Sequence, residues 1–308
     1  MTVAMDELER LLKRYVSTGA AVVVVLLGPG QADTRAPGTP PPSGQATTVE
    51  PSPPGGGIAT ADPTAEPRAT TPPRPTTEPR RAPADRAGVA TDTTAAAAHG
   101  WGTPTRVEDF DGGTAQWQLY DGTGHDGKGR RAPEAVSVRD GVLTITGDPS
   151  GTTGGLSWGK GRRYGRWEAR VRAPAADPSY NAVLLLWPDA EKWPAGGEID
   201  FMEMGDPARR TTDAFVHYGK DNRQVHGSVT TDATRWHNWA VEWTPSSITT
   251  YLDGREWYRV TDAAVQPPGP MHLCIQLDWF PEGGAVRRST MQVDRVREYA
   301  VDTRDAAG

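Results

Sequence analysis

After Trp101 the chain consists of short runs in which apolar and polar residues alternate, separated by Gly, Asp and Pro. Residues 136–139 and 142–145 flank one Asp-Gly dipeptide, and residues 249–252 and 257–260 flank another. Asp-Gly supplies the positive φ angles that a tight hairpin turn requires. The pattern therefore predicts two β-hairpins.

Seven more segments follow the same rhythm and are predicted strands: residues 167–172, 181–187, 199–204, 214–218, 239–243, 273–277 and 291–299. Helical spacing of apolar residues never persists beyond a few positions after residue 101. Residues 182–186 are continuously apolar, which favours a central strand covered on both faces. The pattern therefore predicts an all-β fold for residues 101–303, an antiparallel two-sheet sandwich or jelly roll.

The first hundred residues differ in composition from the rest. Only one of the 23 aromatic residues, Tyr15, precedes position 101, whereas 15 of the 28 prolines do. A segment with almost no large apolar side chains cannot bury enough surface to offset its ordering entropy. We therefore expect residues 33–100 to be a disordered linker rich in Pro, Thr and Ala, either a spacer or a dispensable low-complexity tail.

Residues 16–28 form an apolar run that follows Lys13 and Arg14. A membrane-spanning helix needs roughly 20 apolar residues, whereas the hydrophobic region of a signal peptide needs roughly 7–15. We therefore expect residues 1–32 to be a signal peptide or a short membrane anchor. The protein is expected to be secreted, with anchoring at the cell surface as the alternative.

Charge and cysteine content exclude some classes of partner and bond. The net charge is −6 and no basic stripe is present, so nucleic acid is not an expected partner. Cys274 is the single cysteine and lies in an apolar run, which predicts a small buried side chain without an intramolecular disulfide. We expect a monomer.

The candidate chemistry lies in residues 194–206, where Glu198, Asp200 and Glu203 interrupt a strand that otherwise reads Ile, Phe, Met and Met. Carboxylates buried at close range resist joint ionisation, so three of them on one strand are costly. Hydrolysis of a glycosidic bond uses such a set. One carboxylate attacks the anomeric carbon while a second group, with a raised pKa, protonates the leaving oxygen.

Strand geometry sets a condition on this cluster. Glu198 and Asp200 are two residues apart and share a face, but Glu203 would point to the opposite side of a regular strand. A β-bulge near Phe201 and Met202 would return Glu203 to the face of the other two carboxylates. We therefore predict a bulge at that point.

Residues 197–203, Gly-Glu-Ile-Asp-Phe-Met-Glu, resemble the active-site strand of glycoside hydrolase family 16 in its bulged, laminarinase-like form. Three more parts of the chain resemble other strands of that family: residues 164–170, residues 236–245 with 251–254, and residues 292–297. Together the segments extend the resemblance over essentially all of residues 101–302. It implies a concanavalin A-like jelly roll with a long cleft on its concave sheet.

The resemblance also implies roles. Glu198 would be the nucleophile, Glu203 the general acid/base, and Asp200 the neighbour that holds the nucleophile and tunes its charge. In a retaining enzyme the two catalytic carboxyl groups lie roughly 5–5.5 Å apart. No cofactor is required for this catalysis. Some relatives bind a structural calcium away from the cleft, for which Asp294 and the stretch at Glu108 are the candidate ligands.

A polysaccharide cleft needs aromatic platforms for the apolar faces of sugar rings, beside hydrogen-bonding groups. The alternative for each aromatic candidate is packing in the core, which we expect for Trp167, Trp239 and Trp243 because they lie within alternating strands. The candidate substrate-binding residues are Trp193, Trp187, Trp279 and Trp158 as platforms, with His217, Asn181 and Gln276 as polar contacts.

These features predict a retaining endo-β-glycanase with a polysaccharide substrate, β-1,3-glucan or mixed-linkage β-1,3-1,4-glucan. The alternatives are a transglycosylase or a galactan-cleaving member of the same family, or a non-catalytic carbohydrate-binding jelly roll. Residues 181–187 and 273–280 depart from the family pattern. Both segments are expected to line the cleft, so their departure leaves the linkage open.

Overall fold

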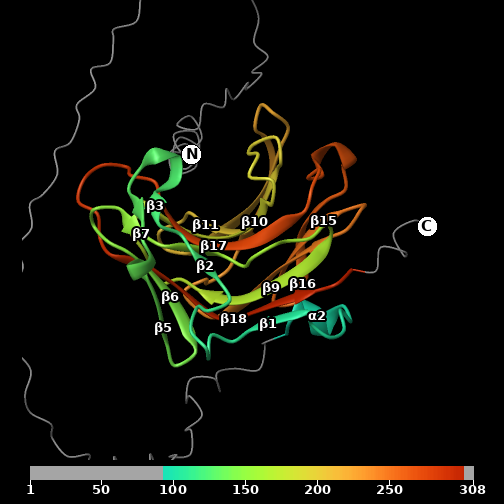
Figure 1. Ribbon diagram of the computed structural model, residues 1–308, viewed down its shortest axis with the longest axis horizontal. Coiled ribbons are helices and arrows are strands. Elements are labelled where there is room, and N and C mark those ends of the chain that lie inside the picture. Colours follow the sequence, from blue (N-terminus) through green and yellow to red (C-terminus); the bar gives the residue numbers. More distant parts are fainter. Residues whose placement is uncertain (1–92, 302–308) are drawn as a thin grey trace, which may run out of the picture. The chain divides into compact units, whose positions relative to one another are not determined.

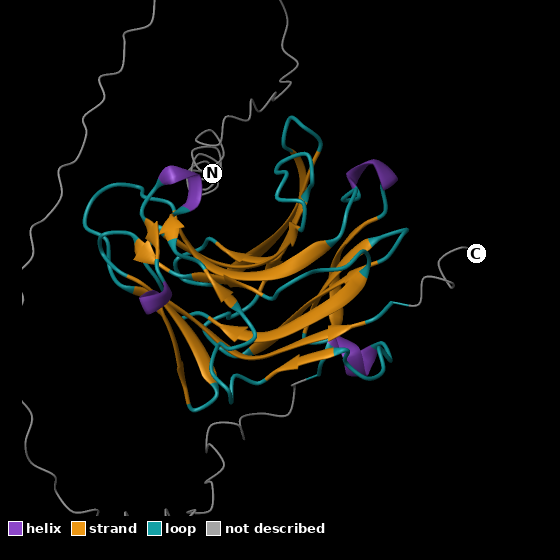
Figure 2. Ribbon diagram, in the orientation of Figure 1, coloured by secondary structure: helices purple, strands orange, loops and turns teal. Residues whose placement is uncertain are grey.

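Two antiparallel sheets lie face to face in the computed structural model, which describes residues 93–301 (Figure 1). Helical segments in this part of the chain are short: α2 (Ala95–Ala98) and the 3-10 turns η2 (His125–Gly127), η3 (Pro133–Ala135) and η4 (Ala263–Val265) (Figure 2). The predicted β-sandwich is confirmed. The predicted signal peptide or anchor and most of the predicted linker lie outside the described residues.

The strands divide into two large sheets and one small one. The first sheet has the order β16 (Arg255–Val260), β15 (Ile248–Leu252), β14 (His237–Trp243), β9 (Gly165–Arg172), β18 (Ser289–Tyr299), β6 (Val142–Gly147) and β5 (Val136–Arg139), with β1 (Arg106–Glu108) also paired to β18. The second has the order β13 (Arg223–Thr230), β12 (Thr211–Tyr218), β11 (Glu198–Met204), β10 (Tyr180–Pro188), β17 (Met271–Trp279), β8 (Gly155–Ser157) and β2 (Gln118–Leu119). The small sheet is β3 (Gly122–Thr123), β4 (Arg130–Arg131) and β7 (Thr152–Thr153).

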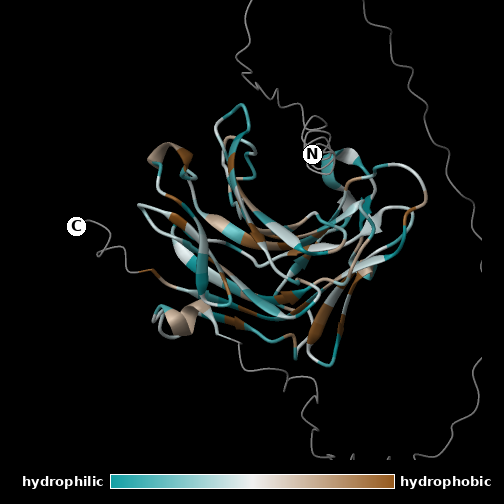
Figure 3. Ribbon diagram, turned by 180° about the vertical axis from the view of Figure 1, so that it is seen from behind, coloured by the Kyte–Doolittle hydropathy of each residue, from teal (hydrophilic) through white to brown (hydrophobic). Residues whose placement is uncertain are grey.

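The core lies between the two large sheets. Every second residue of a strand points inward, and these side chains build the core. One continuous cluster contains Leu184 and Leu186 of β10 together with Trp167, Trp239 and Trp243 of the opposite sheet. The three tryptophans are at most 1% exposed, which confirms the prediction that they pack in the core. Figure 3 shows hydrophobic positions recurring along the strands of both sheets.

Both predicted hairpins are present. Strands β5 and β6 are joined through Asp140 and Gly141, and β15 and β16 through Asp253 and Gly254. All four turn residues have positive φ, between 49° and 76°, as a tight turn between twisted strands requires. The seven other predicted strands correspond to β9, β10, β11, β12, β14, β17 and β18. Strand β13 was not predicted, because its sequence Arg-Gln-Val-His-Gly-Ser-Val-Thr lacks a regular apolar alternation.

Residues before Trp101, the domain boundary expected from the sequence, already pack on the sandwich. Helix α2 places Ala95 under the outer face of the first sheet, where it forms a small buried cluster with Trp101 and Tyr251. The backbone N–H of Ala95 donates to the buried carboxylate of Glu168, 2.6 Å away. The predicted linker therefore extends too far at its end, since residues 93–100 pack on the sandwich. No helix in residues 93–301 is long and apolar enough to cross a membrane.

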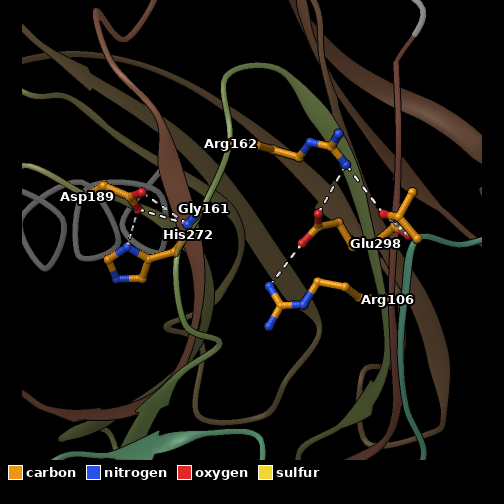
Figure 4. Close-up of polar contacts among 7 residues, drawn as sticks. Arg106, Gly161, Arg162, Asp189, His272 and Glu298 are labelled. Carbon is orange, nitrogen blue, oxygen red and sulfur yellow. Dashed lines mark hydrogen bonds and ion pairs between the residues drawn. The ribbon is translucent and has the colours of Figure 1, made fainter.

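A loop after β8 connects the two sheets at one end of the sandwich (Figure 4). The N–H of Gly161 donates to both carboxylate oxygens of Asp189, which also lies 2.8 Å from Nδ1 of His272 on β17. The next residue, Arg162, forms an ion pair with Glu298 on β18. The loop is therefore held to the second sheet by Gly161 and by the backbone of Arg162, which pairs with Met271, and to the first sheet by the side chain of Arg162.

Gly161 has no room for a side chain, because an added Cβ would collide with the backbone carbonyl of Met271. We expect Gly161→Ala to lower the free energy of unfolding by about 1–3 kcal/mol, the usual cost of overpacking, as measured by urea unfolding. The matched control is Gly269→Ala, since an added Cβ at Gly269 meets no atom within 4 Å. Equal stability of the two variants would contradict this account of the loop.

Candidate active site

Strand β11 carries the three carboxylates, and a bulge brings them to one face. On the β10 side Asp200 pairs with Leu185 and Met202 with Leu184, so Phe201 is an extra residue. Phe201 and Met202 are both fully buried in the core. The bulge predicted at this point is therefore confirmed, and Glu203 faces away from the core.

All three carboxylates line one open cleft of about 1520 Å³ on the outer face of the second sheet. The cleft extends from Gln118 of β2 to His217 of β12. Glu198 and Glu203 are half-buried, and Asp200 is only 4% exposed. The side chains that contact each of them come from neighbouring strands and loops.

Glu198 is held by an aromatic loop that precedes β11. The indole N–H of Trp193 donates to Oε2 of Glu198 at 2.7 Å. The Trp193 ring is 37% exposed and stacks on Trp187 of β10, with ring centroids 6.4 Å apart and an angle of 10° between the planes. Trp193 therefore combines a contact to the carboxylate with a flat apolar surface open to the cleft.

Asp200 and Glu203 have polar partners on the two strands that flank β11. Nε2 of His217 on β12 lies 3.3 Å from Oδ2 of Asp200. The other ring nitrogen of His217, Nδ1, lies 2.8 Å from Oδ1 of Asn222. On the other side, Nδ2 of Asn181 on β10 donates to Oε1 of Glu203 at 2.7 Å. Each carboxylate is thus oriented by a different element of the fold.

Burial raises the pKa of all three carboxyl groups. For Glu203 burial is the main cause and the pKa rises to about 7, with the bond from Asn181 opposing the rise and Asp213 adding to it. The pKa of Asp200 lies well above its ordinary value because of burial and then the charge of Glu203. The pKa of Glu198 is also raised, first by burial and then by the charge of Asp200. The cluster therefore holds protons near neutral pH.

Five of the seven substrate-binding candidates line the cleft with the carboxylates: Trp193, Trp187, His217, Asn181 and Gln276. Trp158 is fully buried and stacks on Trp117 within the core. Trp279 packs against the core cluster because it is three residues from Gln276 and so lies on the opposite face of β17. The prediction that Trp158 and Trp279 are platforms in the cleft is therefore wrong.

Among the cleft residues not found from the sequence are Asp278 of β17, Arg131 of β4 and His125 of η2. Asp278 carried a usable signal, since it is an acid at the end of an apolar strand and two residues after Gln276. Arg131 and His125 lie in a turn-rich region without periodicity, so no local pattern marked them.

The candidate calcium ligands do not fit a cation. Oδ2 of Asp294 lies 3.3 Å from Nη1 of Arg170 and 3.6 Å from Nη1 of Arg295. Both oxygens of Glu108 accept N–H donors, at 2.6 and 3.0 Å. Two guanidinium groups beside Asp294 would repel a divalent cation, so the calcium site expected there is not supported.

One group among the described residues has the spacing of a metal site. Ligand atoms of Glu198, Asp200 and His217 all lie within 4.8 Å of one another. Within this group Glu198 accepts the indole N–H of Trp193, Asp200 lies 3.3 Å from Nε2 of His217, and Nδ1 of His217 lies 2.8 Å from Oδ1 of Asn222. Each of the three residues therefore has a protein partner.

The family model described as "Glycosyl hydrolases family 16" matches residues 128–296, more than half of the chain. Endo-1,3-1,4-beta-glycanase EglC of Rhizobium meliloti is 29% identical over 188 residues, covering 54% of this chain and 40% of that protein. A beta-glucanase of Rhodothermus marinus is 34% identical over 128 residues, covering 38% of this chain and 43% of that protein. The chain thus spans less than half the length of these relatives.

The fold is also similar to solved structures. The X-ray structure of the laminarinase from Rhodothermus marinus superposes with a TM-score of 0.54 at 25% sequence identity. The match covers 64% of this chain and 96% of that one. The described sandwich is therefore similar to nearly the whole of that structure.

The hydrogen bond from Asn181 stabilises the charged form of Glu203, so its removal should raise the pKa of Glu203. We expect Asn181→Leu to move that pKa upward from about 7 by about one to two pH units, the equivalent of one hydrogen bond to a charged group. Infrared difference titration against a Glu203→Gln sample isolates the carboxyl signal. Gln116→Leu, remote from the cleft, is the control, and a downward shift in Asn181→Leu would refute the assignment.

Proposed function

This chain belongs to glycosyl hydrolases family 16, and from that premise we propose that it is a retaining endo-β-glycanase. The proposed substrates are β-1,3-glucan and mixed-linkage β-1,3-1,4-glucan. The observation that carries the proposal is the bulged strand β11, which brings Glu198, Asp200 and Glu203 to one face at the floor of an open cleft. The names of the relatives, a beta-glucanase and an endo-1,3-1,4-beta-glycanase, support the choice of glucan.

In the proposed first step, the carboxylate of Glu198 attacks the anomeric carbon while protonated Glu203 gives its proton to the glycosidic oxygen. The bond between that carbon and oxygen breaks, the leaving sugar departs as an alcohol, and a glycosyl ester on Glu198 remains. A raised pKa of about 7 keeps Glu203 protonated for this step in neutral or mildly acidic solution.

In the second step, ionised Glu203 takes a proton from a water molecule, whose oxygen attacks the anomeric carbon and releases Glu198. The charge of Asp200 raises the pKa of Glu198, so protonation of Asp200, which its own raised pKa favours, helps the nucleophile Glu198 to ionise. The indole N–H of Trp193 favours the same charged form. Transfer to a sugar hydroxyl in place of water would give the transglycosylase alternative.

The shape of the cleft supports cleavage within a chain. Its lining reaches from β2 to β12, six neighbouring strands of the second sheet. Strands lie about 4.8 Å apart, so the lining spans roughly 24 Å. That length holds several sugar rings, which suits an endo-acting enzyme. Secretion, predicted from residues 1–32, would place the enzyme where such polymers occur.

The charge of the cleft favours a neutral substrate. Eight of its lining residues are acidic and two, Arg131 and Lys160, are basic. Even where the three acids of β11 hold protons, the other five outnumber the two basic residues, and this excess of carboxylates repels sulfated or uronic-acid polymers. This observation favours a glucan over a sulfated galactan such as carrageenan.

We expect Glu198→Gln to lower the rate of glucan hydrolysis at least ~1000-fold, and Glu203→Gln to lower it by about 10²–10⁴. Glu203→Gln should lose less activity on aryl glucosides with a good leaving group, because such a group departs with little protonation. Reducing-end release from lichenan and laminarin measures the loss, with Glu134→Gln, an exposed carboxylate, as the control. Glucan binding without turnover by the unmodified protein would favour the non-catalytic alternative.

A panel of polymers tests the role of charge. Neutral lichenan or laminarin should be cleaved at least about a hundredfold faster than carrageenan at low salt, because like charges in contact cost several kcal/mol. Agarose, a galactan without sulfate, separates the effect of charge from that of the sugar. Preferred cleavage of agarose would point to the galactan-cleaving alternative, and efficient cleavage of carrageenan would overturn the charge argument.

A further inference from the structure

A buried ion pair lies in the cleft and has no part in the proposed double displacement. Nη2 of Arg131 on β4 donates to Oδ1 of Asp278 on β17 at 2.5 Å. Arg131 is 9% exposed and Asp278 5% exposed, yet both line the cleft. A buried charged pair is costly to maintain unless its remaining polar atoms are also satisfied.

Two polar atoms at this pair, one on Arg131 and one on the neighbouring Asn181, lack a hydrogen-bond partner among the described residues. They are Nη1 of Arg131 and Oδ1 of Asn181, and both are buried. Asn181 is 2% exposed, so bulk water has little access to replace the missing hydrogen bond. A buried donor and a buried acceptor left open in one cleft are unfavourable until a ligand supplies the bonds.

Strand register places these atoms next to the proposed acid/base. Asn181 of β10 lies directly opposite Asp278 of β17. Glu203 pairs with Val183, so Asn181 lies beyond Glu203 on the side away from Glu198. Asn181 also donates its Nδ2 to Glu203. Asn181 therefore lies between the ion pair and Glu203, the carboxylate that would protonate the leaving oxygen.

The surroundings of Arg131 leave its guanidinium fixed in the cleft. Its Cζ lies 5.3 Å from the centre of the Tyr120 ring, and an added Cβ at Gly155 would lie 2.6 Å from Nη1. Glycine at position 155 thus makes room for the guanidinium. Because Asp278 already neutralises Arg131, the free donor suits a neutral hydroxyl better than a sulfate or carboxylate group.

We propose that Arg131, Asp278 and Asn181 form a hydroxyl-binding subsite that holds a neutral sugar ring of the substrate beside Glu203. Nη1 of Arg131 donates to a sugar hydroxyl, and Oδ1 of Asn181 accepts from one, since a hydroxyl can do both. Asp278 is the positioning residue that fixes the guanidinium. This subsite rests on the proposed function and deepens it by naming residues that would hold an uncharged sugar ring.

Arg131→Lys tests the subsite, because lysine keeps the charge facing Asp278 but loses the planar fork that supplies a second donor. The matched control is Arg130→Lys, whose parent guanidinium is exposed and pairs with Asp121 and Glu134. Both changes are made in the full-length Glu198→Gln protein, and calorimetry measures the Kd of laminaritetraose and of a mixed-linkage glucan tetrasaccharide. We expect Arg131→Lys to weaken binding at least about tenfold and Arg130→Lys to leave it within twofold.

In the catalytically intact protein, Arg131→Lys should raise KM for the polymer more than it lowers kcat. Thermal unfolding checks that the variant is folded. If it is not, Gly155→Ala, whose added Cβ would lie 2.6 Å from Nη1 of Arg131, takes its place and should weaken binding in the same way. Unchanged Kd and KM in a folded variant would overturn the subsite while leaving the proposed function intact. Failure of the parent protein to bind or cleave any glucan would overturn both.

Discussion

The site depends on one backbone irregularity, the bulge at Phe201 and Met202 in β11. Without it, Glu203 would enter the core, where a carboxylate among apolar side chains has no partner. The bulge turns two consecutive apolar residues inward, so the hydrophobic packing of the sandwich fixes the position of the carboxylates on the other face. Core packing and catalytic geometry are thus coupled through a single extra residue.

The cost of placing three acids together is offset by neighbours from separate parts of the fold. Trp193 comes from the loop before β11, His217 from β12 and Asn181 from β10. Against the rise caused by burial, His217 and Trp193 lower the pKa of Glu198, and Asn181 and His217 lower that of Glu203, so the protonation of the cluster depends on several strands of the sheet. The ion pair of Arg131 and Asp278 extends this arrangement to β17 and the small sheet.

Parity along a strand decides which aromatic residues can meet a substrate. Trp187 lies on the cleft face of β10, whereas Trp279 lies on the core face of β17. The position of Trp279 could have been predicted, because a residue three places from Gln276 in a regular strand points to the other side. Trp158 offered less information, since it follows a strand of only three residues.

The sequence by itself determined most of the long strands, the two Asp-Gly hairpins, the three carboxylates and the need for a bulge. These follow from rules that act over a few consecutive residues: alternation, turn φ angles and side-chain parity. Only the tertiary structure decided that Asn181 bonds Glu203, that Arg131 pairs with Asp278, and that the backbone of Ala95 bonds Glu168. Those contacts join residues 22, 147 and 73 positions apart. Strand order and register bring them together, and no local pattern specifies either.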